Sequence, residues 1–322
     1  MPVNSINAKD SGAYVLMDAE SGRLLYGSNS QSQALTASIC KIMTAIVAIE
    51  NGELFKSVKV TREASLCNGS SLYLKENDEI ILVDLIYGLM LRSGNDAALL
   101  ISQNVFNTSA AFIKEMNNYA KKIGMKNSTF ENPSGLDDDS FNYSTPYDMA
   151  LLMRYALQNE LFCKINSTRA YRATSKDNSY YWVNKHKLIA NYSYVKGGKT
   201  GYTKKALRTL VSYAEIDGKR LIAVSFKYSD DYNLHLSLFK KANDEFVYQK
   251  IIDAGVYKAN LEGLNYYPKI ERSVGLLVKK HAKIAVIFYL KKDPDDTCGY
   301  MSIYENSNEI MRQELYPYWP LK

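Results

Sequence analysis

The chain has 322 residues, of which 46% are hydrophobic and 23% are charged, so it is long enough for two domains and has an ordinary globular composition. Its net charge of +6 comes from 40 basic and 34 acidic residues, without a basic run that would indicate a nucleic-acid groove. We therefore expect no nucleic acid among its partners and at most a mild attraction to an anionic polymer such as a cell wall.

The cysteines and histidines argue against several kinds of site. The four cysteines lie far apart without C-x-x-C spacing, which indicates free thiols rather than a zinc site or a disulfide framework: Cys40, Cys67, Cys163 and Cys298. None of the three histidines, His186, His235 and His281, stands in an H-E-x-x-H arrangement, so each is interpreted as structural or exposed. We expect no metal and no cofactor.

The chain shows neither a membrane span nor a signal peptide. No apolar run approaches the roughly 20 residues that a spanning helix needs. The first residues, Met1 to Asn4, also lack a basic segment followed by an apolar one. Two explanations stay open at this point: a cytoplasmic protein, or the mature part of an exported one.

The first strands lead to a serine and a lysine at close spacing. Residues Ala13 to Asp18 and Arg23 to Tyr26 predict a β-hairpin with a glycine-containing turn. Beyond it, apolar residues recur from Ile42 to Ile49 and stop at Asn51-Gly52, which predicts a buried helix.

Ser38 and Lys41 would lie on the first turn of that helix and share one face. A lysine that is desolvated there has a lowered pKa and can act as a base, which makes Ser38 a candidate nucleophile. The alternative is a helix cap with a solvated lysine.

The next block, residues 45 to 159, reads as mainly helical. Strand-like pieces, including Ser70 to Leu74, precede an amphipathic helix from Leu82 to Met90. Further helices are predicted from Thr108 to Gly124, and from Thr145-Pro146 to Ala156, where a threonine cap precedes proline at the first helical position.

Between these helices lies the turn Ser93-Gly94-Asn95. We expect Gly94 to permit the bend and the side chains of Ser93 and Asn95 to project from an apolar layer. An ordinary loop between helices is the alternative.

From Tyr171 onward the pattern changes to strands. Leu207 to Glu215 and Arg220 to Lys227 predict an antiparallel hairpin, and Tyr180 to Val183 another strand. Just before the hairpin, Lys196 to Thr203 alternates lysine and threonine with glycines, which suits an extended strand open to a bound peptide. The spacing of a phosphate-binding loop is not met.

The end of the chain predicts a second domain. Residues 230 to 255 return to a helical pattern that would close the first domain. Short strands are then predicted at Val274 to Lys280, Lys283 to Leu290, Tyr300 to Tyr304 and Glu309 to Tyr316. The predicted domains are residues 1–256 and a small β-rich domain, residues 257–322.

Ser38-x-x-Lys41, Ser93-Gly94-Asn95 and Lys199-Thr200-Gly201 together resemble the three motifs of the penicilloyl serine transferases, in their order and rough separation. The chain is similar to the low-molecular-mass penicillin-binding proteins that are serine-type D-alanyl-D-alanine carboxypeptidases. The similarity covers most of residues 13 to 255 and includes the segments Gly69 to Lys75, Asn132 to Leu136 and Gly201 to Thr203.

The resemblance implies an α+β fold, in which an antiparallel five-stranded sheet is flanked by helices and a mainly helical lobe forms the other side of the active site. It implies that Ser38 attacks a peptide carbonyl, Lys41 takes its proton and Ser93 relays a proton to the leaving D-alanine. In the implied substrate-binding set, the N–H groups of Ser38 and Tyr202 form the oxyanion hole, while the peptide and its carboxylate are held by Asn95, Lys199, Thr200 and Gly201.

Three positions depart from the family pattern. Thr36 replaces the usual proline, Cys40 the usual threonine and Leu207 the usual glycine after the third motif. Cys40 is either a packed side chain or an oxidisable thiol. Leu207 puts the strand geometry behind the site in question.

The predicted function is removal of the terminal D-alanine from peptidoglycan stem peptides, with covalent inhibition by β-lactams. A β-lactamase or esterase of the same fold, or a catalytically silent protein that binds the cell wall, is the alternative. Since this substrate exists only outside the cytoplasmic membrane, we expect an extracytoplasmic protein, associated peripherally with the membrane or the wall, whose gene encodes an upstream signal peptide.

Overall fold

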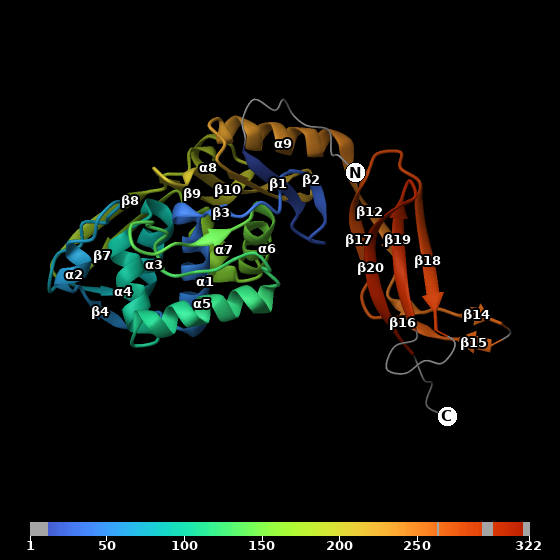
Figure 1. Cartoon of the computed structure of the whole chain (residues 1–322), viewed down its shortest axis with the longest axis horizontal. Helices are drawn as coiled ribbons and strands as arrows, with labels where there is room; N and C mark the ends of the chain where they lie inside the picture. Colours follow the sequence, from blue (N-terminus) through green and yellow to red (C-terminus); the bar gives the residue numbers. More distant parts are fainter. Residues whose placement is uncertain (1–11, 263, 292–298, 318–322) are drawn as a thin grey trace. The chain divides into compact units, whose positions relative to one another are not determined.

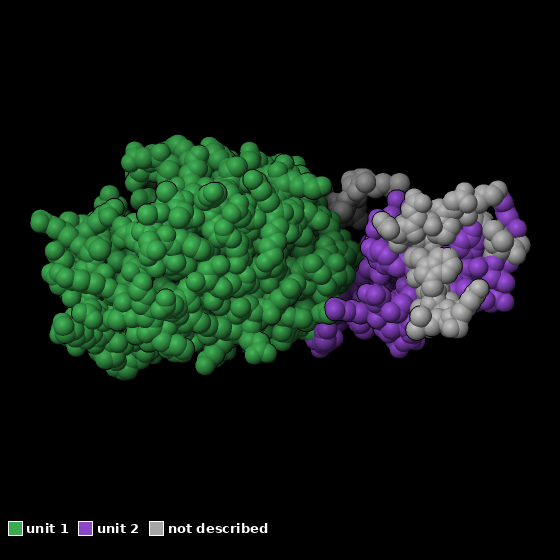
Figure 2. All heavy atoms as spheres, turned by 90° about the horizontal axis from the view of Figure 1, so that it is seen from below, with its two compact units in different colours: residues 1–216, 220–239 green, residues 217–219, 240–322 purple. Residues whose placement is uncertain are grey.

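A computed structural model describes residues 12–262, 264–291 and 299–317. The chain forms two compact units, residues 1–216 with 220–239 and residues 217–219 with 240–322 (Figure 2). The boundary between the units, near residue 239, lies earlier in the chain than the predicted boundary at residue 256. The predicted helical pattern over residues 230 to 255 is wrong for its last residues. Helix α9 (Asp231–Glu245) is followed directly by strand β12 (Phe246–Ile252), which pairs with β17 (Val274–Lys279).

The first unit contains the predicted antiparallel five-stranded sheet. Its order is β2-β1-β11-β10-β9, and these strands are Leu24–Ser28, Ala13–Asp18, Lys219–Phe226, Leu207–Ile216 and Val195–Thr203. Strand β9, which carries the third motif, lies at one edge. One side of β9 pairs with β10 and the other side is left unpaired within the sheet.

Helices cover both faces of this sheet (Figure 1). Helices α8 (Lys187–Asn191) and α9 lie on one face. There His235 of α9 contacts Ser212 of β10 and Ser225 of β11, and His186 also contacts Ser212, so both histidines are buried and structural.

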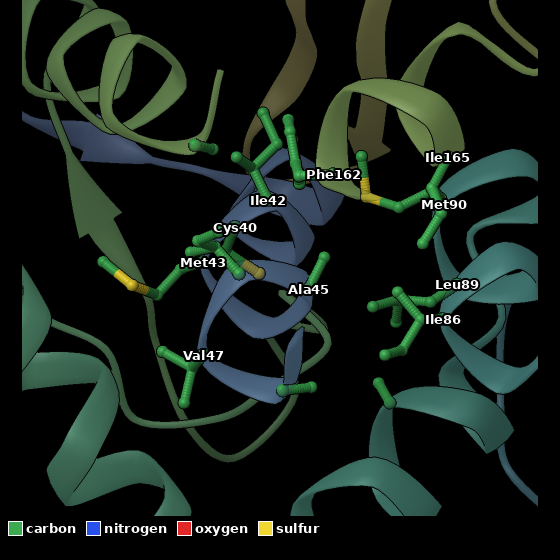
Figure 3. Close-up of a cluster of buried hydrophobic side chains, with 14 of the residues drawn as sticks. Cys40, Ile42, Met43, Ala45, Val47, Ile86, Leu89, Met90, Phe162 and Ile165 are labelled. Carbon is green, nitrogen blue, oxygen red and sulfur yellow. The ribbon is translucent and has the colours of Figure 1, made fainter. Parts of the chain in front are cut away.

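The opposite face packs on α1 (Lys41–Asn51), with α6 (Pro146–Ala156) and α7 (Glu160–Ser167) beside it. Helix α1 is buried over nearly its whole length, from Lys41 to Ile49. Figure 3 shows its side chains packed against Ile86, Leu89 and Met90 of α3 and against Phe162 and Ile165 of α7. A helix enclosed in this way holds its first residues in a fixed position.

The helical lobe matches the sequence pattern closely. Its helices include α2 (Arg62–Ser65), α3 (Leu82–Arg92), α4 (Asn95–Val105) and α5 (Ser109–Ile123). Three short strand pairs accompany the helices of this unit: β4 (Ser57–Lys59) with β5 (Glu79–Ile81), β3 (Ala34–Leu35) with β6 (Tyr143–Ser144), and β7 (Ala170–Thr174) with β8 (Ser179–Val183). The Thr108 side chain caps α5, which ends at Gly124 with φ 85°, and Thr145 caps α6 ahead of Pro146.

The predicted strand at Ser70 to Leu74 is wrong. This segment is irregular because its backbone N–H groups bond to a side chain instead of a neighbouring strand: the N–H of Leu72 donates to the Asp96 carboxylate.

The second unit is β-rich, as predicted. Its remaining strands are β13 (Gly255–Val256), β14 (Ala259–Leu261), β15 (Leu264–Tyr266), β16 (Pro268–Ile270), β18 (Ile284–Leu290), β19 (Gly299–Glu305) and β20 (Asn308–Pro317). They include a five-stranded sheet of order β13-β16-β20-β19-β18. This unit has its own apolar core, which includes Leu276, Met301 and Leu315. In neither unit is a described helix long and apolar enough to span a bilayer.

Candidate active site

Ser38 lies in a short 3-10 turn, Ala37–Cys40, immediately before α1 begins at Lys41. The prediction that both residues share one α-helical turn is therefore only approximately right. Ala37, which is buried, has φ 46°, a left-handed conformation that costs a non-glycine residue about 1 kcal/mol or more. The Thr209 hydroxyl of β10 donates to the Thr36 carbonyl at 2.9 Å and helps to fix the turn.

Lys41 is fully buried, and its Nζ lies 3.1 Å from Ser38 Oγ. It also donates to Asn95 Oδ1 at 2.8 Å and to the Ser134 carbonyl at 2.5 Å. A charged ammonium can donate to all three oxygens. A neutral amine keeps two N–H groups for the Asn95 and Ser134 oxygens, and its lone pair can then accept the Ser38 proton. The site therefore accommodates both protonation states of Lys41 without moving it.

Burial lowers the pKa of Lys41 to about 8. This value already includes a smaller lowering by the charge of Lys185 and the opposite effects of Cys40 and Asp96. The pKa of Lys199 lies well below its usual value because of burial and then because of the nearby charge of Lys41. The cation that acts on Lys41 is Lys185, which the sequence analysis did not identify.

In the Ser93-Gly94-Asn95 turn, the expectation that Gly94 supplies the bend is wrong. Ser93 has the left-handed conformation, with φ 67°, whereas Gly94 has φ −59°. Gly94 is needed for space, because a Cβ there would lie 2.6 Å from Leu72 Cγ. Ser93 Oγ is buried and makes no hydrogen bond within the described residues, so it is not bonded to Ser38 or Lys41.

Asn95 is the first residue of α4, and both ends of its amide are used inside the protein. Its Oδ1 accepts from Lys41, and its Nδ2 donates to the Asn68 carbonyl at 2.7 Å. This arrangement orients Lys41. The predicted contact of Asn95 with a substrate amide stays a prediction.

Strand β9 places Thr200, Gly201 and Tyr202 beside Ser38, and the buried Lys199 precedes them on the same strand. Lys199 is 2% exposed, and its ammonium donates to the Thr200 carbonyl at 2.8 Å. No carboxylate within the described residues pairs with it. A Cβ at Gly201 would lie 2.3 Å from Thr209 Oγ1 and 3.0 Å from Ser38 N, so glycine is required for the strand to approach the turn.

A cleft of about 580 Å³ opens over these groups, and Ser38, Ser93, Thr200, Gly201 and Tyr202 all line it. The cleft also contains residues that the sequence analysis did not identify, Lys185, Arg208 and Tyr232. Arg208 is held by Asp231 in a two-point contact of 2.7 and 3.1 Å. These residues follow no motif spacing. Lys185 lies between β8 and α8, Arg208 near the start of β10 and Tyr232 on α9, so only the tertiary fold brings them to one cleft.

The structure decides between the two interpretations of Cys40. The side chain is fully buried and burial raises the pKa of its thiol, so Cys40 is a packed residue. Cys40, Cys67 and Cys163 are free thiols as predicted, and Cys298 lies outside the described residues. Leu207 has φ 61°, the left-handed conformation that glycine adopts without strain, and it still pairs in register with Thr203.

Residues 3–229 match the model of the peptidase S11 family, D-alanyl-D-alanine carboxypeptidase. The chain belongs to this family. One relative is the D-alanyl-D-alanine carboxypeptidase DacF of Bacillus subtilis, with 32% identity over 79% of this chain and 66% of the relative. Another is the D-alanyl-D-alanine carboxypeptidase DacC of Escherichia coli K12, with 32% identity over 67% of this chain and 56% of the relative. The chain thus spans roughly three fifths of the length of these two relatives.

Among solved structures, a mutant of the Streptomyces K15 DD-transpeptidase matches this S11-family chain with TM-score 0.65 and 30% identity, covering 72% of this chain and 95% of the other. Penicillin binding protein 5 from Haemophilus influenzae matches with TM-score 0.83 over 98% of both chains. At 23% identity, this second likeness shows the fold alone.

Proposed function

We propose that this protein is a serine D,D-carboxypeptidase that removes the terminal D-alanine from peptidoglycan stem peptides. The observation that carries the proposal is the position of Lys41 Nζ, 3.1 Å from Ser38 Oγ and held by two further oxygens. A buried lysine with a pKa of about 8 is neutral often enough near neutral pH to act as a base.

In this mechanism Lys41 takes the proton of Ser38 while Oγ attacks the carbonyl carbon of the penultimate D-alanine. The N–H groups of Ser38 and Tyr202 stabilise the tetrahedral oxyanion, a contribution of about 3 kcal/mol for each donor. The hydroxyl of Ser93, which makes no hydrogen bond within the described residues, passes its proton to the leaving D-alanine nitrogen as the peptide bond breaks, and it takes in return the proton that Lys41 holds. Water then hydrolyses the ester on Ser38 and restores the enzyme.

The substrate carboxylate is assigned to Lys199 and Thr200. Lys199 is buried, yet its only hydrogen bond within the described residues is to a carbonyl. An anion bound there would raise the pKa of Lys199 and compensate for the burial of its charge. Peptidoglycan as substrate also implies a protein that acts outside the cytoplasmic membrane.

Penicillin tests this proposal, because its β-lactam ring opens on the same nucleophile. Intact-mass measurement after incubation should show one penicillin added to the protein, and the adduct should persist for minutes. Ser38→Ala should show none. Absence of both adduct and turnover would support a silent wall-binding protein, and rapid turnover of penicillin would support a β-lactamase.

A further inference from the structure

The same unit contains a second groove. It has a volume of about 400 Å³ and is lined by Ser71, Leu72, Tyr73, Arg92 and strand β8 from Ser179 to Val183. Two segments of the chain contribute to both the cleft and the groove. Ser70 and Ser93 line the cleft, whereas their neighbours Ser71 and Arg92 line the groove, so the groove lies near the cleft.

One wall of the groove is a tyrosine held out into solvent. Tyr73 is 76% exposed and has φ 61°, a conformation that costs free energy for a residue with a side chain. The loop is held there by the fully buried Asp96, whose carboxylate accepts from Ser71 Oγ at 2.7 Å and from the Leu72 N–H at 2.8 Å. A strained, rigidly supported and exposed aromatic ring is typical of a binding surface rather than of a packed core.

Strand β8 forms another wall of the groove. Tyr181 is 63% exposed and Arg172 lies over its ring, 5.6 Å from the centroid. The next residue, Trp182, is buried and stacks on Tyr171 and Tyr180, which anchors the strand. The groove is therefore lined by two exposed tyrosines, each on an anchored segment.

Arg92 supplies a polar group in the same groove. Its Nη1 donates to the Val183 carbonyl at 3.2 Å, and within the described residues no carboxylate pairs with its guanidinium. A guanidinium has five N–H donors, so several stay available to a carbonyl of a ligand.

We propose that this groove binds the N-acetylated sugar rings of the glycan strand to which the stem peptide is attached. The proposal rests on the function proposed above. The C–H faces of a pyranose ring stack on tyrosine, and an acetamido carbonyl accepts from Arg92. A pentapeptide in the cleft extends at most about 17 Å, so its sugar end lies near the protein surface and not far out in solvent.

Two substrates test this, a disaccharide pentapeptide and the same pentapeptide without sugars. The test variant is Tyr73→Asn with Tyr181→Thr, since asparagine tolerates the left-handed conformation and threonine suits a strand. Tyr248→Thr is the control, because Tyr248 is an exposed strand tyrosine of the second unit. For release of D-alanine by the wild type and the control, the kcat/KM should be about tenfold higher with the sugar-bearing substrate than with the free pentapeptide. The test variant should lose that preference and keep the wild-type rate on the free pentapeptide.

Equal kcat/KM of the wild type for both substrates would overturn the proposal, and so would a test variant that keeps the preference. Equal losses on both substrates would also overturn it, because they would show that the groove holds peptide. Calorimetry of the binding of the two compounds to the Ser38→Ala variant tests whether the groove binds sugar, independently of turnover. If the wild type cleaves neither compound, the carboxypeptidase function fails, while the relative affinities of Ser38→Ala still decide whether the groove binds sugar.

Discussion

The Oδ1 atom of Asn95 accepts a hydrogen bond from Lys41 Nζ at 2.8 Å, across 54 residues of sequence. The Nδ2 of the same amide is bonded to the Asn68 carbonyl, which fixes the oxygen toward the lysine. Together with the Ser134 carbonyl, this oxygen sets the direction of the Lys41 lone pair toward Ser38. Asn95 is thus a positioning residue for the candidate base.

The acylation rate should depend on pH through Lys41. Because the pKa of Lys41 is lowered to about 8, its reactive neutral form is present at about a tenth at pH 7 and predominates above pH 9. Stopped-flow acylation by a chromogenic β-lactam should therefore rise about tenfold from pH 6 to 7 and level off above pH 8. A rate that stays constant from pH 6 to 9 would argue against Lys41 as the base.

Replacement of Asn95 should move this pH profile in a direction set by charge. Asn95→Asp places a carboxylate next to Lys41, which favours the charged lysine and raises its pKa. The acylation rate at pH 7 should then fall and recover at higher pH. Asn95→Leu has a similar size and removes the oxygen that accepts from the charged lysine, so the midpoint of the pH profile should shift to lower pH. Shifts in the same direction for both variants would contradict the role of Asn95.

The two buried lysines should respond differently to arginine. Lys41→Arg should abolish acylation, because arginine stays charged near neutral pH and cannot take the Ser38 proton. Lys199→Arg retains a cation that can pair with a carboxylate, so measurable acylation should remain with weaker substrate binding. Circular dichroism serves as the folding control. Equal acylation rates for the two variants would refute this division between base and carboxylate anchor.

Leu207→Gly should give a more stable protein than Leu207→Ala. The left-handed conformation at this position costs about 1–2 kcal/mol for a residue with a side chain, and glycine relieves it. The leucine side chain is 48% exposed, and both replacements lose its buried half alike. After the entropy cost of glycine, a difference of about 0.5–1 kcal/mol in the free energy of unfolding remains in favour of glycine. Thermal or urea denaturation compares the variants, and equal stability of the glycine and alanine variants would show that strain is not the cause.

The sequence by itself determined the local elements and the proximity of Ser38 and Lys41. Thr108 with Gly124, and Thr145 with Pro146, marked the ends of helices because capping depends on neighbouring residues. The spacing of Ser38 and Lys41 likewise required their proximity, since three residues at the start of a helix leave the side chains little freedom.

Only the tertiary structure decided what surrounds that pair. The Ser134 carbonyl reaches Lys41 from 93 residues away, and a backbone oxygen leaves no signature in the sequence. The loop from Ser70 to Leu74 is irregular against its local propensity, because Asp96 supplies the hydrogen bonds that a strand would have made. Ser93 likewise adopts a left-handed conformation that its residue type does not favour. The lowered pKa of Lys41 has the same origin, since burial is produced by the packing of distant elements.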